Sequence, residues 1–232
     1  MTGLTKMYCY RMFRQKSLYI IWAITVVMIL LNLQMIEQRT FSTLLCKSGT
    51  LVTMLSPLFT AIIFSADHSS GFIKNYAGSV SDKTVIIAAR AVIILIQNLL
   101  SCCVVVISGL LLTRSIGDTK IAVVYTMCML LAGLGCSFAV MLITDLFRKT
   151  VPALILTLAI GTGILCELIS TITAFATDGD IIIKNYLLTG MFQIFGETQS
   201  SSDAVKVVLI SVIYIAAALT ASVFSIKKRD VI

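Results

Sequence analysis

Long apolar blocks separated by short polar segments dominate this sequence. Six stretches contain no charged residue at all, and they cover 17–36, 48–66, 91–113, 121–144, 150–166 and 207–226. Each is close to the roughly 20 residues that a helix rising about 1.5 Å per residue needs to cross about 30 Å of hydrocarbon. The pattern therefore predicts an all-α integral membrane protein with six transmembrane helices.

Some of the predicted spans extend beyond the uncharged blocks. The fifth continues past Glu167, because residues 168–176 are again uncharged and mostly apolar. With such extensions the spans cover about 17–36, 48–66, 85–113, 121–144, 150–176 and 207–226. We expect residues 1–232 to form a single transmembrane domain.

Two shorter helices are expected outside the spans. Leu4, Met7, Tyr8 and Met12 fall on one helical face, which favours an interfacial helix over residues 1–16. The alternative for this segment is a basic tail that serves only as a topology signal. In the last loop, 177–206, an apolar stretch too short to span predicts an interfacial or re-entrant helix.

Basic residues are distributed unevenly between the two sides of the predicted topology. With the N-terminus inside, 12 of the 18 Lys and Arg residues lie in the inner segments. This bias predicts a multi-pass protein of the cell membrane with both termini in the cytoplasm. It also explains the formal net charge of +7 as a topology signal, so no nucleic-acid partner is expected.

The residue patterns of an enzyme or a metal site are not found in the sequence. Seven cysteines are scattered without a CxxC pair, and a single histidine is present to join them. No HExxH motif and no nucleophile with a histidine at membrane depth are available for hydrolysis. Because a GxxxxGK[ST] loop is also missing, we expect no enzyme activity, ATP site, cofactor or metal on this chain.

The most informative polar segment joins the second and third predicted spans. Between Gly71 and Gly78 the chain has room for about two helical turns, which predicts a short cytoplasmic helix. Apolar Phe72 and Tyr76 lie there beside Lys74, and apolar anchors with a polar rim suit docking to a partner. The alternative is a connector whose glycines merely permit tight turns.

This segment resembles the first cytoplasmic loop of ABC-2 type permeases. In that family an acidic residue at the end of span two precedes a glycine and a basic–Asn pair, as do Asp67, Gly71, Lys74 and Asn75 here. Further family positions are matched by Ser81, Lys83 and Arg90. The basic N-terminal segment, the six spans and the long last outer loop extend the resemblance over the whole chain, which is similar to small lantibiotic-immunity and multidrug exporter permeases.

The resemblance implies a permease subunit of an ATP-driven exporter for a hydrophobic or amphipathic substrate, such as a peptide, a bacteriocin in a self-immunity system, or a drug. It implies cytosolic ABC ATPase subunits that hold ATP and Mg, and a second permease copy or a sister permease. The ATPase-coupling residues would be Asp67, Gly71, Phe72, Lys74, Asn75 and Tyr76. The alternative function is an ATP-independent membrane carrier or channel, which we expect to show more intramembrane charge or an internal repeat.

Three polar residues within the spans are candidates for a substrate path. Glu167 is the only acid inside a span, and intramembrane acids are functional candidates. Alternatively, it lies near the outer surface and pairs with Lys184 or Lys206. Gln97 and Asn98 in span three either bond to neighbouring helices or line the path, and both alternatives stay open.

Two Gly-x-Gly pairs, at 133–135 and 161–163, lie within the fourth and fifth spans. Small residues let membrane helices approach closely. We therefore expect these glycines to be packing sites rather than substrate contacts.

Overall fold

Helices make up nearly all of this chain, whose computed structural model describes residues 2–36, 39–70, 84–113, 115–147, 149–176 and 183–228. The long helices are α2 (Lys16–Gln34), α4 (Thr50–Ser69), α6 (Thr84–Leu112), α7 (Thr119–Phe147) and α11 (Ser201–Lys228). The shorter ones are α1 (Thr2–Arg14), α3 (Phe41–Ser48), α8 (Thr150–Gly161), α9 (Ile164–Ala176), η1 (Ile183–Tyr186) and α10 (Leu188–Thr198). Within these described ranges there is no strand, and one isolated bridge joins Thr40 to Ser115.

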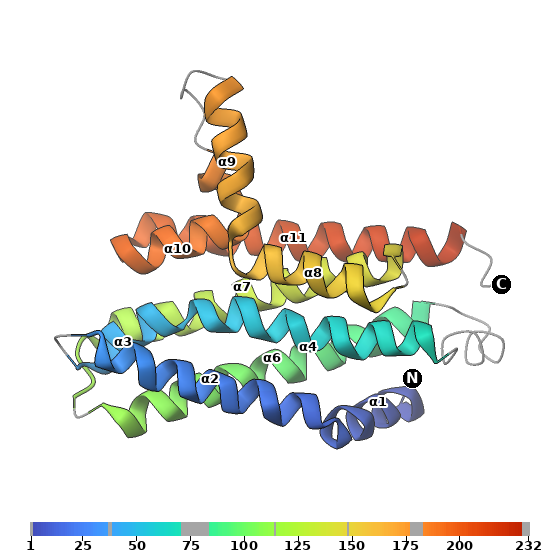
Figure 1. Cartoon of the computed structure of the whole chain (residues 1–232), viewed down its shortest axis with the longest axis horizontal. Helices are drawn as coiled ribbons and strands as arrows, with labels where there is room; N and C mark the ends of the chain where they lie inside the picture. Colours follow the sequence, from blue (N-terminus) through green and yellow to red (C-terminus); the bar gives the residue numbers. More distant parts are fainter. Residues whose placement is uncertain are drawn as a thin grey trace.

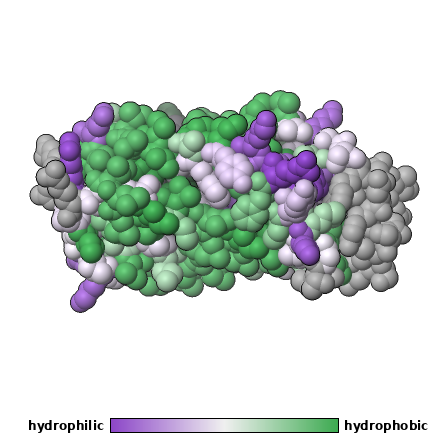
Figure 2. Space-filling model, turned by 90° about the horizontal axis from the view of Figure 1, so that it is seen from below, coloured by the Kyte–Doolittle hydropathy of each residue, from purple (hydrophilic) through white to green (hydrophobic). Residues whose placement is uncertain are grey.

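The long helices run side by side along the long axis of the molecule (Figure 1). Helix α7 packs against α4, α6 and α11, while α4 also packs against α8. Helices α4 and α7 are mostly buried, whereas α2 and α11 expose apolar side chains such as Ile20, Val27, Leu209 and Ile213. In Figure 2, hydrophilic residues lie to either side of a broad apolar surface. An apolar surface this extensive is typical of a protein surrounded by hydrocarbon.

Five of the described helices, α2, α4, α6, α7 and α11, are long and apolar enough to cross a membrane. The pair α8 and α9 passes the same test as one unit, although the two helices meet at 68°. These lengths and compositions confirm the predicted class, an all-α membrane-spanning protein. The five long helices begin and end within a few residues of the expected spans, except that α11 starts at Ser201 rather than near residue 207.

The fifth expected span is not one continuous helix. Helix α8 ends at Gly161, and Gly163 has a φ of 79°, a left-handed conformation that favours glycine. Helix α9 then leaves the bundle at 68° and projects from its side (Figure 1). After η1, the chain returns as α10, which packs against α11 and α7. The helix expected in the last loop is thus present as α10, which is held against the bundle.

The N-terminal segment forms a helix, as its periodicity predicts. Leu4, Tyr8 and Met12 on its apolar face are almost completely buried. Helix α1 makes its main contact with α6, so these side chains pack against protein rather than facing outward. Lys6 and Arg14 lie on the exposed side of the helix.

Candidate functional site: a buried ion-pair cluster

Polar side chains from four helices meet at one end of the bundle. This end of the bundle carries α1, the last turn of α4, the start of α6 and the ends of α7 and α11 (Figure 1). The set, which we call the ion-pair cluster, comprises Tyr8, Arg11, Asp67, His68, Arg90 and Asp145. Ionisable groups inside a membrane protein are expensive to bury, which makes such a cluster a candidate functional site.

Arg90 of α6 lies at the centre of the cluster, and its side chain is 0% exposed. Its Nη1 donates to Oδ1 of Asp145 at 2.6 Å, and its Nη2 lies 3.7 Å from Oδ2 of Asp67. The guanidinium carbon is 4.7 Å from the centroid of the Phe64 ring, which is within cation–π range. Arginine suits this position because it stays charged and presents several donors at once. Arg90 therefore bridges carboxylates on α4 and α7.

Asp67 of α4 is bound from two further sides. The Tyr8 hydroxyl donates to its Oδ2 at 2.7 Å, and Arg11 Nη1 donates to its Oδ1 at 2.5 Å. Burial raises the pKa of Tyr8 above its ordinary value, so the phenol keeps its proton and remains a donor. Through Asp67, helix α1 is tied to α4 and, by way of Arg90, to α6.

Asp145 near the end of α7 receives a second contact from α4. His68 Nε2 lies 3.1 Å from the same Oδ1 that accepts from Arg90. Two arginines face two aspartates in this cluster, so its formal charge is balanced when His68 is neutral. A buried set of charges is tolerated when it is complete, whereas loss of one member leaves an uncompensated charge.

The expected ATPase-coupling residues fall partly inside this site and partly beyond the described structure. Asp67 is in the cluster with its side chain 0% exposed, so it contacts α1 and α6 and has no surface available for another subunit. Gly71, Phe72, Lys74, Asn75 and Tyr76, together with the short helix expected there, lie outside the described residues. Residues 71–83 are joined directly to α4 and α6 and therefore to both sides of the cluster.

Sequence reasoning noted Asp67 and Arg90 but missed their partners in α1 and α7. The available signal was that Arg11, Arg90 and Asp145 lie near helix ends on the same predicted side of the membrane. That signal indicates only how deep each residue lies in the membrane. It does not show which residues are in contact, because the contacts join residues 55 to 59 positions apart in the chain. Among the described residues, no group of three or more His, Cys, Asp or Glu side chains is placed to hold a metal ion.

Gln97 and Asn98 form a second, uncharged network in the middle of α6. Gln97 Nε2 donates to the Ser56 hydroxyl at 2.8 Å, and that hydroxyl donates to Asn98 Oδ1, also at 2.8 Å. Asn98 Nδ2 donates to Ser137 Oγ at 3.1 Å, which extends the network from α4 to α7. Thr60 completes it by donating to Gln97 Oε1 at 3.2 Å. Both amides thus make interhelical bonds, which was one of the two alternatives.

Glu167 lies on the projecting helix α9, away from the ion-pair cluster. It accepts a hydrogen bond from Lys184 Nζ at 2.7 Å, and its side chain is 60% exposed. This hydrogen bond raises the pKa of Lys184, so the amine stays charged. One alternative for Glu167 was an ion pair with Lys184 or Lys206 rather than a place on a substrate path. The structure shows the ion pair with Lys184, whereas Lys206 pairs with Asp203.

Removing this exposed pair is expected to have a small effect. We predict that Glu167→Gln changes the free energy of unfolding by less than about 1 kcal/mol, because exposed ion pairs contribute little. The midpoint of SDS-induced unfolding in micelles would measure it. In a transport assay, wild-type activity of the stable variant would remove Glu167 from the substrate path, whereas loss of transport would place it there.

The described residues form an all-helical protein with helices apolar and long enough to span a membrane, and a largely buried ion-pair cluster lies at one end of its bundle. No protein-family model matches the chain, and no curated protein matches it.

Proposed function

We propose that this chain is the permease subunit of an ABC-type exporter, with six membrane spans and both termini in the cytoplasm. The observation that carries the proposal is that the ion-pair cluster takes residues from the end of α4 and the start of α6, the two helices that residues 71–83 join in sequence. Asp67 is in the last turn of α4 and Arg90 in the second turn of α6, so both ends of that connection are tied to the cluster. A partner bound to the connection would act on Arg90 and Asp67 through the ends of α4 and α6, since both side chains are buried.

The cluster provides a physical route for such an action. Arg90 links α6 to α7 through Asp145, and Asp67 links α4 to α1 through Tyr8 and Arg11. Coupling needs a contiguous set of contacts that can adopt two arrangements, and ion pairs between rigid helices meet the first requirement. A movement of residues 71–83 would therefore be transmitted through the cluster to four helices.

The placement of the helix ends supports the proposed orientation. The start of α1, the end of α4, the start of α6 and the end of α11 lie at the same end of the bundle (Figure 1). In the proposed topology this is the side that holds 12 of the 18 basic residues, as expected for a cytoplasmic side. In this topology α8 and α9, which together pass the length and hydropathy test for a span, would provide the fifth crossing.

The proposal also implies partner subunits and a class of substrate. Because the sequence has no phosphate-binding loop, separate cytosolic subunits would bind and hydrolyse ATP. Phe72, Lys74, Asn75 and Tyr76 would contact those subunits, and a second permease copy or a sister permease would complete the transporter. The substrate class that we propose is a hydrophobic or amphipathic molecule such as a peptide or a drug.

Co-purification from native membranes tests the proposal. We expect the wild-type chain to retain an ATPase subunit and the double variant Lys74→Glu with Tyr76→Ala to lose it, because the charge and the aromatic anchor of the connection are both removed. A matched control is Lys6→Glu with Tyr10→Ala, which makes the same changes on the exposed side of α1. This control is expected to retain the ATPase.

Two results would count against the proposal. If no ATPase accompanies the wild-type chain, the ATP-independent carrier or channel becomes the better explanation, and transport by the purified chain alone in liposomes would establish it. If the ATPase stays with a folded Lys74→Glu, Tyr76→Ala variant, the docking site lies elsewhere on the chain.

A further inference from the structure

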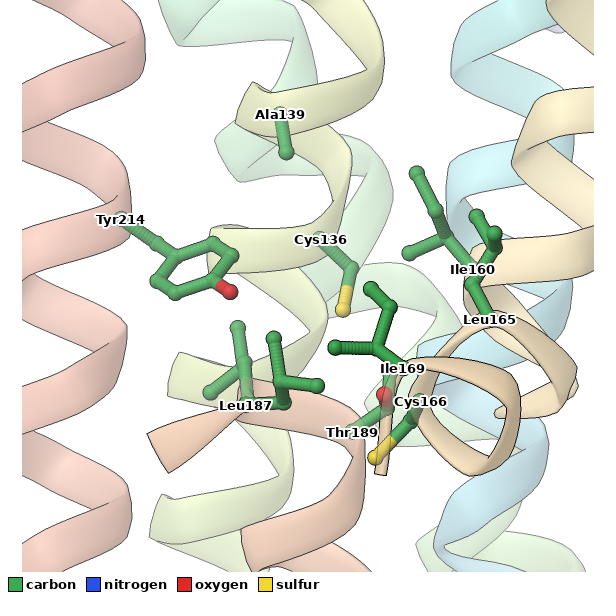
Figure 3. A pocket seen from close by; sticks show the side chains of 10 residues that line it. Cys136, Ala139, Ile160, Leu165, Cys166, Ile169, Leu187, Thr189 and Tyr214 are labelled. Carbon is green, nitrogen blue, oxygen red and sulfur yellow. The ribbon is translucent and has the colours of Figure 1, made fainter. Parts of the chain in front are cut away.

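An apolar cavity of about 140 Å³ lies near the middle of the bundle, where α8 gives way to α9 and α10 approaches α7 and α11. Figure 3 shows Tyr214 of α11 and Cys136 of α7 reaching into it from one side, with Ile160 of α8 and Ile169 of α9 across from them. Leu187 closes it from the start of α10. Its walls are almost entirely apolar, and their only polar groups are thiols and the hydroxyls of Tyr214 and Thr189.

A shallow apolar groove continues from this cavity along α7 and α11. Ala139 and Tyr214 line both spaces, and the groove extends to Ile143 on α7 and Ala221 on α11. On both helices these higher numbers lead toward the end of the bundle that holds Asp145. From Tyr214 to Ala221 the path is about 10 Å long at 1.5 Å per residue. The two spaces therefore form one apolar track from near one end of the bundle to its middle.

Water is a poor occupant of this track. A buried water needs two to four polar partners, and the cavity offers almost none. Apolar cavities of about 150 Å³ stay dry in water and bind apolar molecules as small as benzene. Around the groove, α11 exposes Ile213 and Val212, so the track opens onto a surface that contacts hydrocarbon in a membrane-spanning protein.

We propose that the cavity and the groove bind one acyl chain of a bilayer lipid, with the end of the chain in the cavity. The direction in which the groove runs favours an acyl chain as the occupant. A lipid chain runs from the membrane surface toward the bilayer centre, as the groove runs from near the end of the bundle to its middle. The bound acyl chain would fill the space beside the break between α8 and α9, and so stabilise the packing of α8 and α10 against α7 and α11. This site is independent of any ATPase and goes beyond the proposed transport function.

Photolabelling in liposomes tests the site. The full chain is reconstituted with a phosphatidylcholine that carries a diazirine at the end of one acyl chain, irradiated, and analysed by peptide mass spectrometry. We expect labelling around Cys136, Ala139 and Tyr214 to exceed, by several-fold, that at Ile24 and Val27. These two exposed residues lie midway along α2 and report ordinary lipid contact at a similar depth.

Filling the cavity provides the decisive comparison. Ala139→Phe adds a phenyl ring, which is the size of ligand that such a cavity holds, so labelling at Cys136 and Tyr214 is expected to fall several-fold while labelling on α2 stays unchanged. The matched control Ala216→Phe adds the same ring on the exposed side of α11 and is expected to keep the labelling. If Ala139→Phe does not fold, Ala139→Leu should lower the labelling in part.

Two outcomes would overturn the proposal. One is wild-type labelling at the cavity that is no higher than at Ile24 and Val27. In that case a second copy of the protein or a substrate would be the better candidate for the occupant. The other is unchanged labelling in a folded Ala139→Phe variant, because the added ring would not affect an acyl chain that binds elsewhere.

Discussion

Replacement of Arg90 by glutamine is expected to destabilise the protein by about 3–5 kcal/mol, because breaking a buried ion pair by removing one partner leaves the other charge uncompensated. Asp145 would lose the donor at 2.6 Å, and Asp67 the cation at 3.7 Å. Glutamine is shorter and uncharged, so the variant removes the charge together with the hydrogen bond to Asp145 and the cation–π contact with Phe64. The shift in the midpoint of SDS-induced unfolding, followed by circular dichroism in micelles, measures the effect.

Two comparisons make the result specific to the cluster. Lys206→Gln removes an exposed ion pair with Asp203, and it is expected to cost less than about 1 kcal/mol. Arg90→Met combined with Asp145→Leu removes both charges of the buried pair and should recover much of the loss, since apolar replacement of a whole pair is often neutral. If Arg90→Gln is as mild as Lys206→Gln, Arg90 does not hold the helices together as its burial indicates.

The positions of five long helices could be predicted because charge-free length is a direct physical requirement for crossing hydrocarbon. The same argument did not predict the break within the fifth expected span. Residues 150–176 form an apolar run interrupted by a single acid, so nothing in hydropathy distinguishes one helix from two. The signal was Gly163, whose positive φ allows the turn, but a glycine inside an apolar run is equally consistent with a straight, closely packed helix.

The candidate site was predictable only in part for a similar reason. Hydropathy places Arg90 and Asp145 near one surface, but it does not show which helices are neighbours. The contact between α1 and α6, which buries Tyr8 beside Asp67, depends on packing between segments far apart in the chain. The apolar face of α1 was visible in the sequence, yet membrane lipid and a neighbouring helix are equally good partners for such a face.

Gly161 is the position where the packing prediction can be tested most severely. A Cβ atom built there would lie 2.8 Å from Met54 Cα and 3.2 Å from Met54 O, so the obstacle is backbone of α4 that cannot rotate away. We expect Gly161→Val to destabilise the protein by about 3 kcal/mol, the upper end of the usual cost of overpacking. Gly3→Val makes the same change where the built Cβ meets no other described part of the chain within 4 Å, apart from its neighbours and its own helix backbone, and it should leave the unfolding midpoint nearly unchanged.

Gly161→Val is also expected to affect the apolar cavity. Ile160 lines the apolar cavity and directly precedes Gly161, so pushing α8 away from α4 moves one wall of the cavity. Photolabelling at Cys136 should therefore change in Gly161→Val, whereas Gly3→Val should leave it as in the wild type. A Gly161→Val protein with wild-type stability would show that α8 does not rest on α4 at Met54, and the break at Gly163 would then need another cause.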